Sequence, residues 1–577
     1  MVVTAGNEGR KTIFAHKLTG IVDFAVRSHL RAVAVLLVVA LLGFLPGFFA
    51  IPPIDRDEAR FAQATKQMVE SGDYIDIHFQ DEVRYKKPVG IYWAQAAVVK
   101  TASALGFRSA LTTIWVYRVP SFIGAVGAVL LTYWAALALV SRRAAVLAGL
   151  MMASCILLGI ERLTAKTDAM LLMTVVAAMG AMARAYLSLR GEPRGALDGA
   201  DAWLVAAVFW TALAVGVLLK GPLIVMVVGL AAVALIVVDR SAFWLMALKP
   251  LPGVVWFAVL VLPWFIAIMG RAGEQFLAES VGQDLLSKIF SGQESHGAPP
   301  GYYFILFWLT FWPGATLAAI ATPAVWAARR EPVTKFLLAW LVPSWIVLEL
   351  VVTKLPHYVL PLYPAVAILI AGVLDARLLS RRPVLVWGTM WWFVVPTIAG
   401  LTGIIMLAVI GRQFGFLVWP VFGFAAFLAF LAWRLYEADG PEHALLRAVA
   451  AATLTAIGIF ALVVPSLGQL FPSQALARVL RDSGCRAPMA AAVGYQEPSL
   501  VFLTGTATRL TDTYGAAEFL RGGDCRFAFV EAHQERAFAQ RAEAIGLRYS
   551  AGPRVEGFNI STGQPVTIAV FRSAGAS

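Results

Sequence analysis

Charged residues are scarce in this sequence, and acidic ones are scarcer than basic ones. Only 14% of the 577 residues are charged, whereas a soluble globular protein has about 25%. This low fraction excludes a soluble globular chain, and the 59% of hydrophobic residues indicate an integral membrane protein. The formal net charge of +12 does not indicate a nucleic-acid partner, because the basic residues are spread over many short loops instead of one face.

Long hydrophobic runs are abundant. A membrane-spanning helix needs about 20 mostly apolar residues, and the sequence offers thirteen such segments. They are residues 32–50, 115–140, 143–160, 168–188, 203–219, 221–238, 251–269, 303–327, 335–352, 358–375, 384–410, 416–433 and 447–466. The runs are continuous and do not alternate as barrel strands do, so we predict an α-helical polytopic membrane protein.

The basic residues of the short loops predict the orientation. If residues 1–31 form a cytoplasmic N-terminal segment, alternate loops on the inner side are consistently basic. The first helix is expected to stay attached, because the apolar run is too long for a signal peptide and lacks a convincing cleavage site. Residues 51–114 then form the first outer loop. Its part from 89 to 114 could be a fourteenth span, but Lys100 interrupts it, and we expect a helix at the outer interface.

Composition changes after the last predicted span. Residues 467–577 have ordinary polarity and are expected to form a small α/β domain outside the cytoplasm. Strands are predicted at 488–494, 526–530 and 565–571, and helices at 473–482, 515–521 and 533–545. Cys485 and Cys525 could form a disulfide there, but the sequence alone does not show whether their Cα atoms come within bonding range.

The first outer loop begins with a concentration of acidic residues, in PPIDRDEAR. Asp55 or Asp57 can cap a helix that starts near Glu58, and carboxylates at a helix N-terminus are stabilised by its dipole. Three acids in four residues nevertheless repel one another. Arg56, Arg60, a metal ion or a cationic substrate would compensate them. We therefore interpret the motif as a proton acceptor or metal ligand.

The same loop continues into YKKPVGIYW, which places two ammonium groups at the lipid interface. Lys86 and Lys87 would suit a phosphate group. The alternative is that both side chains extend to the lipid headgroups, as lysines near helix ends often do. The nearby acidic motif favours the phosphate, because one loop would then hold a leaving group and activate an acceptor.

Other outer turns carry matching groups. Asp168 opens a span with Lys166 close by, either as a simple cap or as part of a site, and Lys220 lies at the next outer turn. The loop 270–302 has the length and glycine content of a mobile cover, and its His296 could bind a metal or shuttle a proton.

The last outer motif is VTKLPHYVLPLYP, which places Lys354, His357 and Tyr358 just before a span. When the thirteen segments are threaded through a bilayer, this motif and all the polar groups above emerge on one face. A shared polar site between the helices would require that arrangement.

The order of these motifs resembles a known family. RDEARFAQATKQMVESGDY, YKKPVGIYW, an aspartate opening the fourth span and KLPHYVLPLYP look like the lipid-to-lipid glycosyltransferases of the GT-C fold. The nearest resemblance is to the 4-amino-4-deoxy-L-arabinose lipid A transferases and their galacturonic acid-transferring relatives. They share a superfamily with the dolichyl-phosphate-mannose protein mannosyltransferases. The similarity covers most of the chain.

The resemblance implies transfer of a sugar from a polyprenyl-phosphate donor to lipid A or another envelope acceptor, on the periplasmic face of a bacterial inner membrane. Asp57 would be the catalytic carboxylate and Glu58 would support it, with Asp168 as the second acid. Lys87 would bind the donor phosphate, and His357 and Tyr358 would lie near that phosphate or its metal. We place Lys86, Arg60 and Lys354 in the same phosphate-binding group.

One position departs from the family. Many relatives have glutamate where this chain has Lys86, which removes one candidate ligand and leaves a divalent metal cofactor in doubt. An added cation at this point would favour an anionic uronic acid over aminoarabinose in the donor. Unchanged donor preference in Lys86→Glu would count against that hypothesis.

Two other function classes fit parts of the pattern. A protein O-glycosyltransferase of the same fold would share the carboxylate motif and the donor type. A lipid or solute transporter would instead place its polar groups near the bilayer midplane on broken helices. The polar motifs of this chain cluster at one interface, which favours the transferase.

Overall fold

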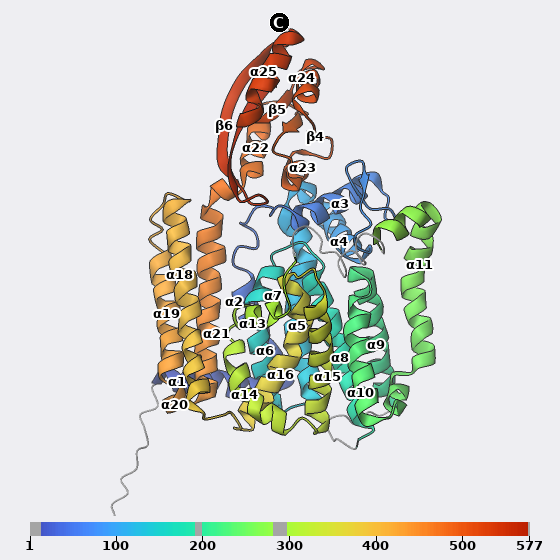
Figure 1. Ribbon diagram of the computed structural model, residues 1–577, viewed down its shortest axis with the longest axis vertical. Helices are drawn as coiled ribbons and strands as arrows, with labels where there is room; N and C mark the ends of the chain where they lie inside the picture. The colour runs from blue at the N-terminus through green and yellow to red at the C-terminus, as the bar shows by residue number, and fades with distance from the viewer. Residues whose placement is uncertain (1–12, 191–198, 281–296, 575–577) are drawn as a thin grey trace, which may run out of the picture.

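The computed structural model describes residues 13–190, 199–280 and 297–574. It consists of a helical bundle with a smaller α/β domain at one end, which we call the upper end after the view in Figure 1. Residues 281–296 of the predicted cover loop, His296 among them, lie outside the described residues.

The bundle is built from long apolar helices, as predicted. Its elements are α1 (Ile13–Val26), α2 (His29–Phe44), α5 (Ile114–Leu137), α6 (Arg142–Ala153), α7 (Ile156–Glu161), α8 (Asp168–Ser188), α9 (Gly199–Lys220), α10 (Leu223–Asp239), α11 (Pro250–Leu277), α13 (Tyr302–Thr310), α14 (Ala315–Ala327), α15 (Pro332–Leu350), α16 (Tyr363–Asp375), α17 (Pro383–Trp387), α18 (Trp391–Val409), α19 (Val418–Arg434), α20 (Tyr436–Asp439) and α21 (Pro441–Ile457).

Within the described ranges, eight helices are long and apolar enough to cross a membrane, or nine if the bent pair α13 and α14 counts as one span. Three further apolar helices, α2, α10 and α19, are shorter. Two of the predicted spans are broken. The segment 143–160 divides into α6 and α7, and the chain bends by 117° between α13 and α14. The chain is a multi-pass membrane protein, and the count of thirteen crossings stays a prediction.

Charged side chains at the lower end of the bundle pair with one another. Asp239 at the end of α10 binds both Arg190 and Lys335, at 2.5 and 2.6 Å. Arg143 at the start of α6 binds Asp23 and Glu442, at 2.7 and 2.5 Å. Ion pairs among loops that are distant in sequence hold this end together. The cations predicted for the inner loops therefore gather opposite the α/β domain, in accord with the predicted orientation.

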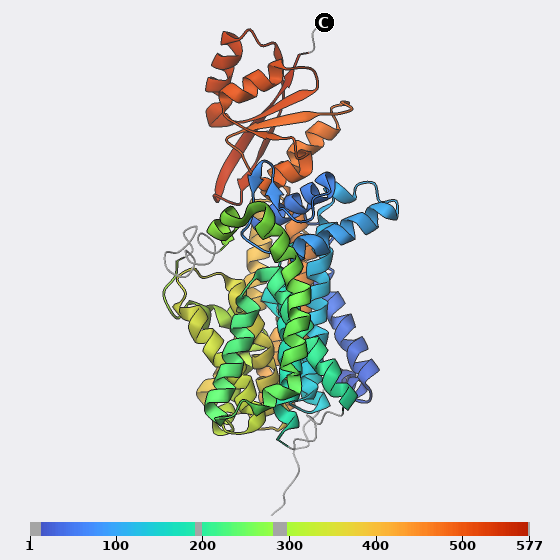
Figure 2. The same cartoon turned by 90° about the vertical axis from the view of Figure 1, so that its right-hand side faces the viewer.

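The first outer loop folds into a layer between the bundle and the α/β domain (Figure 2). It contains α3 (Asp57–Ser71), the short hairpin β1 (His78–Phe79) and β2 (Glu82–Val83), and α4 (Gly90–Ala104). With 15 residues, α4 is not among the helices long enough to span a membrane, and it lies beside α3 above the bundle. Gly90 lets it approach α9 closely, since a Cβ there would lie 2.7 Å from the carbonyl oxygen of Leu218.

The α/β domain is a mixed five-stranded sheet with helices on both faces. Its elements are α22 (Pro472–Arg481), β3 (Met489–Val493), α23 (Pro498–Thr504), β4 (Arg509–Leu510), α24 (Thr513–Arg521), β5 (Arg526–Glu531), α25 (Glu535–Ala544), β6 (Tyr549–Asn559) and β7 (Gln564–Ser573). The strand order is β4-β3-β5-β7-β6, with β3 parallel to β4 and β5 and the remaining pairs antiparallel.

Alternation along the central strand β5 explains the two cores of this domain. Phe527 and Phe529 pack under α22 and α23, whereas Ala528 and Val530 face α24 and α25. The three predicted strands and three predicted helices are all present. The prediction missed α23, β4 and β6, and β6 gives no alternating signal because most of its residues are exposed.

Cys485 and Cys525 form a disulfide, with their Cα atoms 5.8 Å apart. The bond links the segment before β3 to the start of β5 across 40 residues of sequence. Replacing both cysteines by serine should lower the free energy of unfolding of this domain by about 2–4 kcal/mol, because the unfolded chain loses a cross-link. Thermal unfolding of the purified protein would measure this, and an unchanged Tm would contradict it.

Candidate functional site

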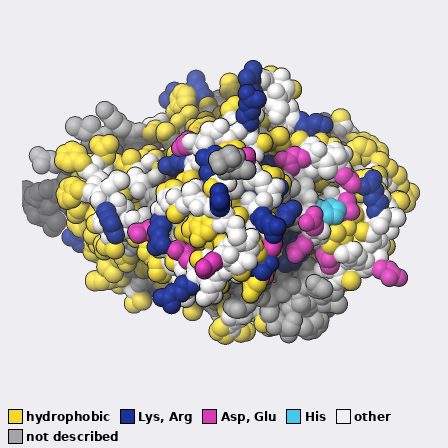
Figure 3. Space-filling view, turned by 90° about the horizontal axis from the view of Figure 1, so that it is seen from above, with side chains coloured by type: hydrophobic (Ala, Val, Ile, Leu, Met, Phe, Trp, Pro, Cys, Tyr) yellow, Lys and Arg dark blue, Asp and Glu magenta, His cyan; other side chains and the backbone are white. Residues whose placement is uncertain are grey.

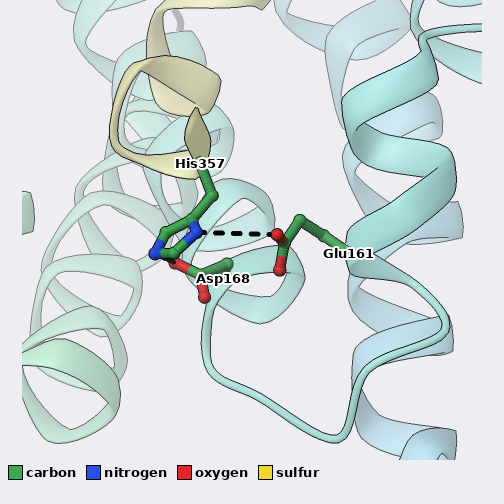
Figure 4. A group of neighbouring side chains, drawn as sticks. All are labelled: Glu161, Asp168 and His357. Atoms are coloured by element: carbon green, nitrogen blue, oxygen red, sulfur yellow. Dashed lines mark ion pairs between the residues drawn. The ribbon is translucent and has the colours of Figure 1, made fainter. Parts of the chain in front are cut away.

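A cluster of buried charged side chains lies at the upper end of the bundle. Glu161, Asp168 and His357 meet there (Figure 4). His357 Nδ1 lies 3.6 Å from Glu161 Oε1, and its Nε2 lies 3.7 Å from Asp168 Oδ1. Lys220 makes an ion pair and hydrogen bond with Asp168, and Lys166 lies 3.2 Å from Glu161 and 3.9 Å from Asp168. We call these five residues the upper cluster.

Four separate segments supply the upper cluster. Glu161 ends α7, Asp168 begins α8, Lys220 ends α9, and His357 lies in the 3₁₀ turn Pro356–Leu362. The start of α8 is fixed by close packing against α5, because a Cβ on Gly124 would lie 2.5 Å from the backbone nitrogen of Met170. Helix ends that approach from different parts of the chain therefore place the charges together.

The charges of the upper cluster balance within it. Two carboxylates face two ammonium groups, and all four side chains are largely buried. Glu161, Asp168 and His357 have the residue types of a metal site, with ligand atoms within 4.8 Å of one another. A divalent ion would, however, have to displace Lys166 and Lys220 from those carboxylates. The donor set therefore fits ion pairing better than a resident metal.

Two further predicted residues adjoin the cluster. The ammonium of Lys220 lies 5.0 Å from the ring centre of Tyr358, a cation–π distance. Lys87 lies close enough to His357 for an electrostatic interaction, and its Nζ donates a hydrogen bond to the carbonyl of Lys86 at 2.8 Å. The close approach of α4 to α9 described above brings this lysine-proline step beside Lys220. A cation from α9 and one from the turn before α4 therefore both lie near His357.

Asp57 is exposed at the first position of α3. Burial alone would lower the pKa of Lys166, but the carboxylates of Glu161, Asp168 and Asp57 raise it above its usual value. Asp57 therefore lies within electrostatic reach of the upper cluster while remaining accessible. Among the three acids of the PPIDRDEAR motif, it is the one whose side chain is exposed.

Glu58, the neighbour of Asp57, is buried in an ion pair instead. Its carboxylate accepts two hydrogen bonds from Arg118, at 2.7 and 2.9 Å, and the Arg118 side chain is completely buried. Glu58 also accepts hydrogen bonds from the backbone N–H groups of Ile54 and Ala165. Arg118 donates its remaining hydrogen bonds to backbone carbonyls, including that of Ile51 at 2.7 Å. These bonds connect α3 to α5 and to the loop before α8.

Removing the Glu58 carboxylate should damage folding more than chemistry. Glu58→Ala leaves the buried Arg118 unpaired, which costs about 3–5 kcal/mol. We expect a lower Tm and a lower yield of folded protein in detergent, whereas Glu82→Ala, an exposed change on the same loop, should leave both unchanged. A Glu58→Ala protein with the wild-type Tm would contradict the structural role.

Asp55 does not cap the helix, contrary to one of the sequence-based expectations, and neither does Asp57. The N-cap position of α3 is Arg56, and no side chain makes a capping hydrogen bond there. Asp55 Oδ1 instead accepts a hydrogen bond of 3.0 Å from the backbone N–H of Ser499, at the start of α23. The capping expectation was wrong because the α/β domain offers this carboxylate a buried donor that a short sequence window cannot reveal.

Burial raises the pKa of Asp55 to about 7, and the carboxylates of Glu497 and Glu58 add to the rise, while the bond from Ser499 opposes it. The folded protein therefore retains this proton up to about pH 7, whereas an unfolded chain releases it near pH 4. Folded stability falls as the pH rises between these two values.

The wild-type Tm should therefore decline from pH 5 to pH 8, and Asp55→Asn, which cannot ionise, should remove that part of the decline. Between pH 5 and pH 8 the difference corresponds to about 3 kcal/mol. Thermal unfolding followed by intrinsic fluorescence across this range would measure it. Parallel pH profiles for the two proteins would show that Asp55 does not carry the effect.

The other predicted site residues have different positions. Lys354 is buried, and its ammonium donates to the backbone carbonyls of Glu349 and Val351, so the structure does not bring it to the cluster. Arg60 is half-buried one turn along α3 from Asp57, and Lys86 is exposed. His296 falls outside the described ranges.

Sequence reasoning did not select two of the residues that matter most. Glu161 was not singled out, although a carboxylate at the end of an apolar run is itself a signal of function. Arg118 was also missed. It lies within the first turns of a predicted span, where a charged residue is the same kind of signal. Lys220 was noted only as a cation at an outer turn, and nothing in the sequence indicated its pairing with Asp168.

An apolar cavity of about 820 Å³ lies between helices of the bundle. Side chains from α2, α7, α13, α18 and the segment after α21 line it, and Ile156 and Ile160 contribute from the helix that ends at Glu161. Its lining is almost entirely hydrophobic, so it suits a hydrocarbon chain. The cavity and the upper cluster therefore share α7.

Comparisons with known proteins support the resemblance noted in the sequence. No protein-family model matches the chain. It is 27% identical over 317 residues to an undecaprenyl phosphate-alpha-4-amino-4-deoxy-L-arabinose arabinosyl transferase of Erwinia tasmaniensis, covering 55% of this chain and 54% of the relative. A transferase of the same name from Enterobacter sp. (strain 638) is 25% identical over 394 residues, covering 66% of each chain. The chain thus spans between half and two thirds of the curated relatives it matches.

The fold is that of a solved transferase. ArnT from Cupriavidus metallidurans, bound to undecaprenyl phosphate, matches with a TM-score of 0.71 and 18% sequence identity, over 93% of this chain and 97% of the other. Its apo structure matches with a TM-score of 0.70. The expected GT-C-type architecture, a polytopic helical part with a small C-terminal α/β domain, is therefore confirmed, together with the predicted resemblance to the aminoarabinose transferases.

Proposed function

We propose that this chain, whose fold and sequence resemble those of the aminoarabinose transferases, transfers a sugar from a polyprenyl-phosphate donor to an envelope acceptor. The observation that carries the proposal is the convergence at one end of the bundle of Lys87, Lys220 and Tyr358 with the accessible carboxylate of Asp57. The membrane would be a bacterial inner membrane, with this end on its periplasmic face.

The cations of the site suit the leaving group. When the bond between the anomeric carbon and the phosphate oxygen breaks, the bonding electrons leave with the polyprenyl phosphate. Lys87, in the turn before α4, and Lys220, at the end of α9, would stabilise that charge in a poorly solvated site. Lys220 would have to divide its hydrogen bonds between Asp168 and the phosphate, so Asp168 orients it.

Asp57 is the group that meets the acceptor in this proposal. If the acceptor is a hydroxyl, Asp57 would take its proton as the oxygen attacks the anomeric carbon, and the product would have inverted configuration. If the acceptor is an ionised phosphate, no proton needs removal, and Asp57 would orient the sugar. Glu58 supports it only by holding the start of α3 in place.

The apolar cavity suits a lipid chain of either substrate. Its hydrophobic lining would bury prenyl or acyl groups, at roughly 25 cal/mol per Å² of apolar surface. Since α7 both lines the cavity and ends at Glu161, a chain bound there would keep its headgroup near the upper cluster. This arrangement favours a lipid-linked substrate over a soluble one.

Lipid A or another envelope glycolipid is the proposed acceptor, and the donor sugar would be aminoarabinose or a uronic acid. A transporter is less consistent with the structure, because the buried charges lie at helix ends beside the first outer loop and not on helices broken at the midplane. A protein acceptor would use the same cluster and would leave the envelope glycolipids unmodified.

The proposal predicts a carboxylate-dependent change in envelope lipids. Cells that lack the gene should lose one pentose or uronic-acid mass increment from lipid A or another glycolipid. Wild-type protein should restore it, and Asp57→Asn should not, because that amide cannot accept a proton. Mass spectrometry of extracted lipids measures the increment, and Asp81→Asn, an exposed change on the same loop, is the matched control. Full restoration by folded Asp57→Asn would refute the assigned role.

A further inference from the structure

The α/β domain is attached directly to the helix that begins with Asp57. Its short helix α23 is held at both ends by the segment 55–66. The N–H of Ser499 donates to Asp55 at the start of α23, and Lys66 donates to the carbonyl of Phe502 near its end, each at 3.0 Å. Gln63 adds a hydrogen bond of 2.9 Å to Thr506. The domain therefore contacts the first turns of α3 through directional polar bonds.

The backbone between Asp55 and Asp57 is strained. Arg56 has φ 67° and ψ −119°, a backbone conformation that residues other than glycine rarely adopt. Such a residue persists only where its surroundings fix it. The guanidinium of Arg56 donates to the carbonyl of Ser561 in the loop between β6 and β7, and the Ser561 hydroxyl donates to Glu497 at 2.8 Å. The α/β domain thus holds this residue as well.

The residues on both sides of Asp57 are consequently held by other parts of the protein, and we call these two sets of contacts its anchors. On one side Asp55 and Arg56 bind the α/β domain, and on the other Glu58 binds Arg118 of the bundle. The side chain of Asp57 itself stays exposed. Since its direction follows from the backbone on both sides, a change at either anchor turns the carboxylate relative to the upper cluster.

We propose that the α/β domain is a working part of the transfer site, and that Asp55 and Arg56 are positioning residues through which it aims the Asp57 carboxylate. The inference rests on the proposed function. Misplacement of a reacting group by about 1 Å can cost about 100-fold in rate. Loss of this anchor should therefore reduce turnover without weakening donor binding, which uses other helices.

Docking of the domain does not depend on Asp55 alone. Phe502 is completely buried against Ala62 and Tyr117, and its ring lies 5.2 Å from that of Tyr117. This apolar contact should keep α23 in place when Asp55 or Arg56 is altered. Variants at these two positions are therefore expected to remain folded, and they test positioning separately from assembly.

The experiment compares full-length variants in lipid nanodiscs. Asp55→Ala removes the acceptor of the Ser499 N–H, whereas Asp55→Asn keeps one. Arg56→Ala loses the contact and retains the strain, whereas Arg56→Gly loses the contact and relieves the strain. Glu535→Gln, which breaks an exposed ion pair with Arg554 elsewhere in the domain, is the control. Transfer kinetics with an undecaprenyl-phosphate sugar and hydrogen exchange of residues 54–60 are the two measurements.

We expect kcat to fall on the order of 10- to 100-fold in Asp55→Ala and Arg56→Ala, with KM for the donor changed less than about threefold. Hydrogen exchange over 54–60 should become faster in both. Asp55→Asn should retain most of the wild-type kcat. Arg56→Gly should lose less kcat than Arg56→Ala, because it loses the same contact but not the strained backbone. Glu535→Gln should match wild type in every measurement.

Two results would overturn the inference. One is a wild-type kcat in Asp55→Ala or Arg56→Ala despite faster exchange, since the anchor would then not direct the chemistry. The other is unchanged exchange over 54–60 in both, since the domain would then not hold the loop. Failure of the proposed function is distinguishable, because wild-type protein would then show no transfer while the exchange measurement still reports on the anchor.

Discussion

The buried ion pair between Glu58 and Arg118 is the interaction on which the site depends. It fixes the start of α3 to α5, and through the Ala165 N–H it also fixes the loop that leads to Asp168. Gln95 of α4 donates to the carbonyl of Ala165 and accepts from Thr65 of α3. The loop before α8 is thus hydrogen-bonded to both α3 and α4. A buried pair contributes little net stability by itself, but its geometry must be satisfied or the fold loses much more. These bonds fix the positions of α3, α4 and the loop before α8 relative to one another.

The fixed arrangement of these elements suits a reaction at a membrane surface. The carboxylates and ammonium groups of the upper cluster are buried and neutralise one another. Their charges are therefore compensated without water, and they need not reorganise when a substrate binds. In the proposed reaction, Lys87 and Lys220 would then hold a lipid phosphate, and the apolar cavity would hold its chain. Asp57 is the exception, because it stays exposed at the junction of the bundle, the first outer loop and the α/β domain. The proposed reaction uses that difference between one accessible carboxylate and several buried ones.

Much of this arrangement could be predicted from the sequence, and the reasons for the failures are physical. Hydrophobic length and the bias of loop charges place Asp57, Lys87, Asp168 and His357 at one end, because both act along the chain and are visible within a short window. Contacts between distant segments are not visible in this way. The pairing of Lys220 with Asp168 depends on how α9 packs beside α8. Likewise, the sequence around Asp55 indicates a helix cap, whereas in the structure its carboxylate accepts a hydrogen bond from the start of α23.

Direct transfer by the purified protein tests the central claim most sharply. The wild-type chain in nanodiscs would be supplied with undecaprenyl phosphate carrying aminoarabinose or a uronic acid, and with lipid A, and all lipids would be followed by mass spectrometry. We expect lipid A or a related glycolipid to gain the mass of one sugar as free undecaprenyl phosphate accumulates in equal amount. Intact donor after incubation with every envelope glycolipid and protein acceptor offered would contradict the proposed reaction.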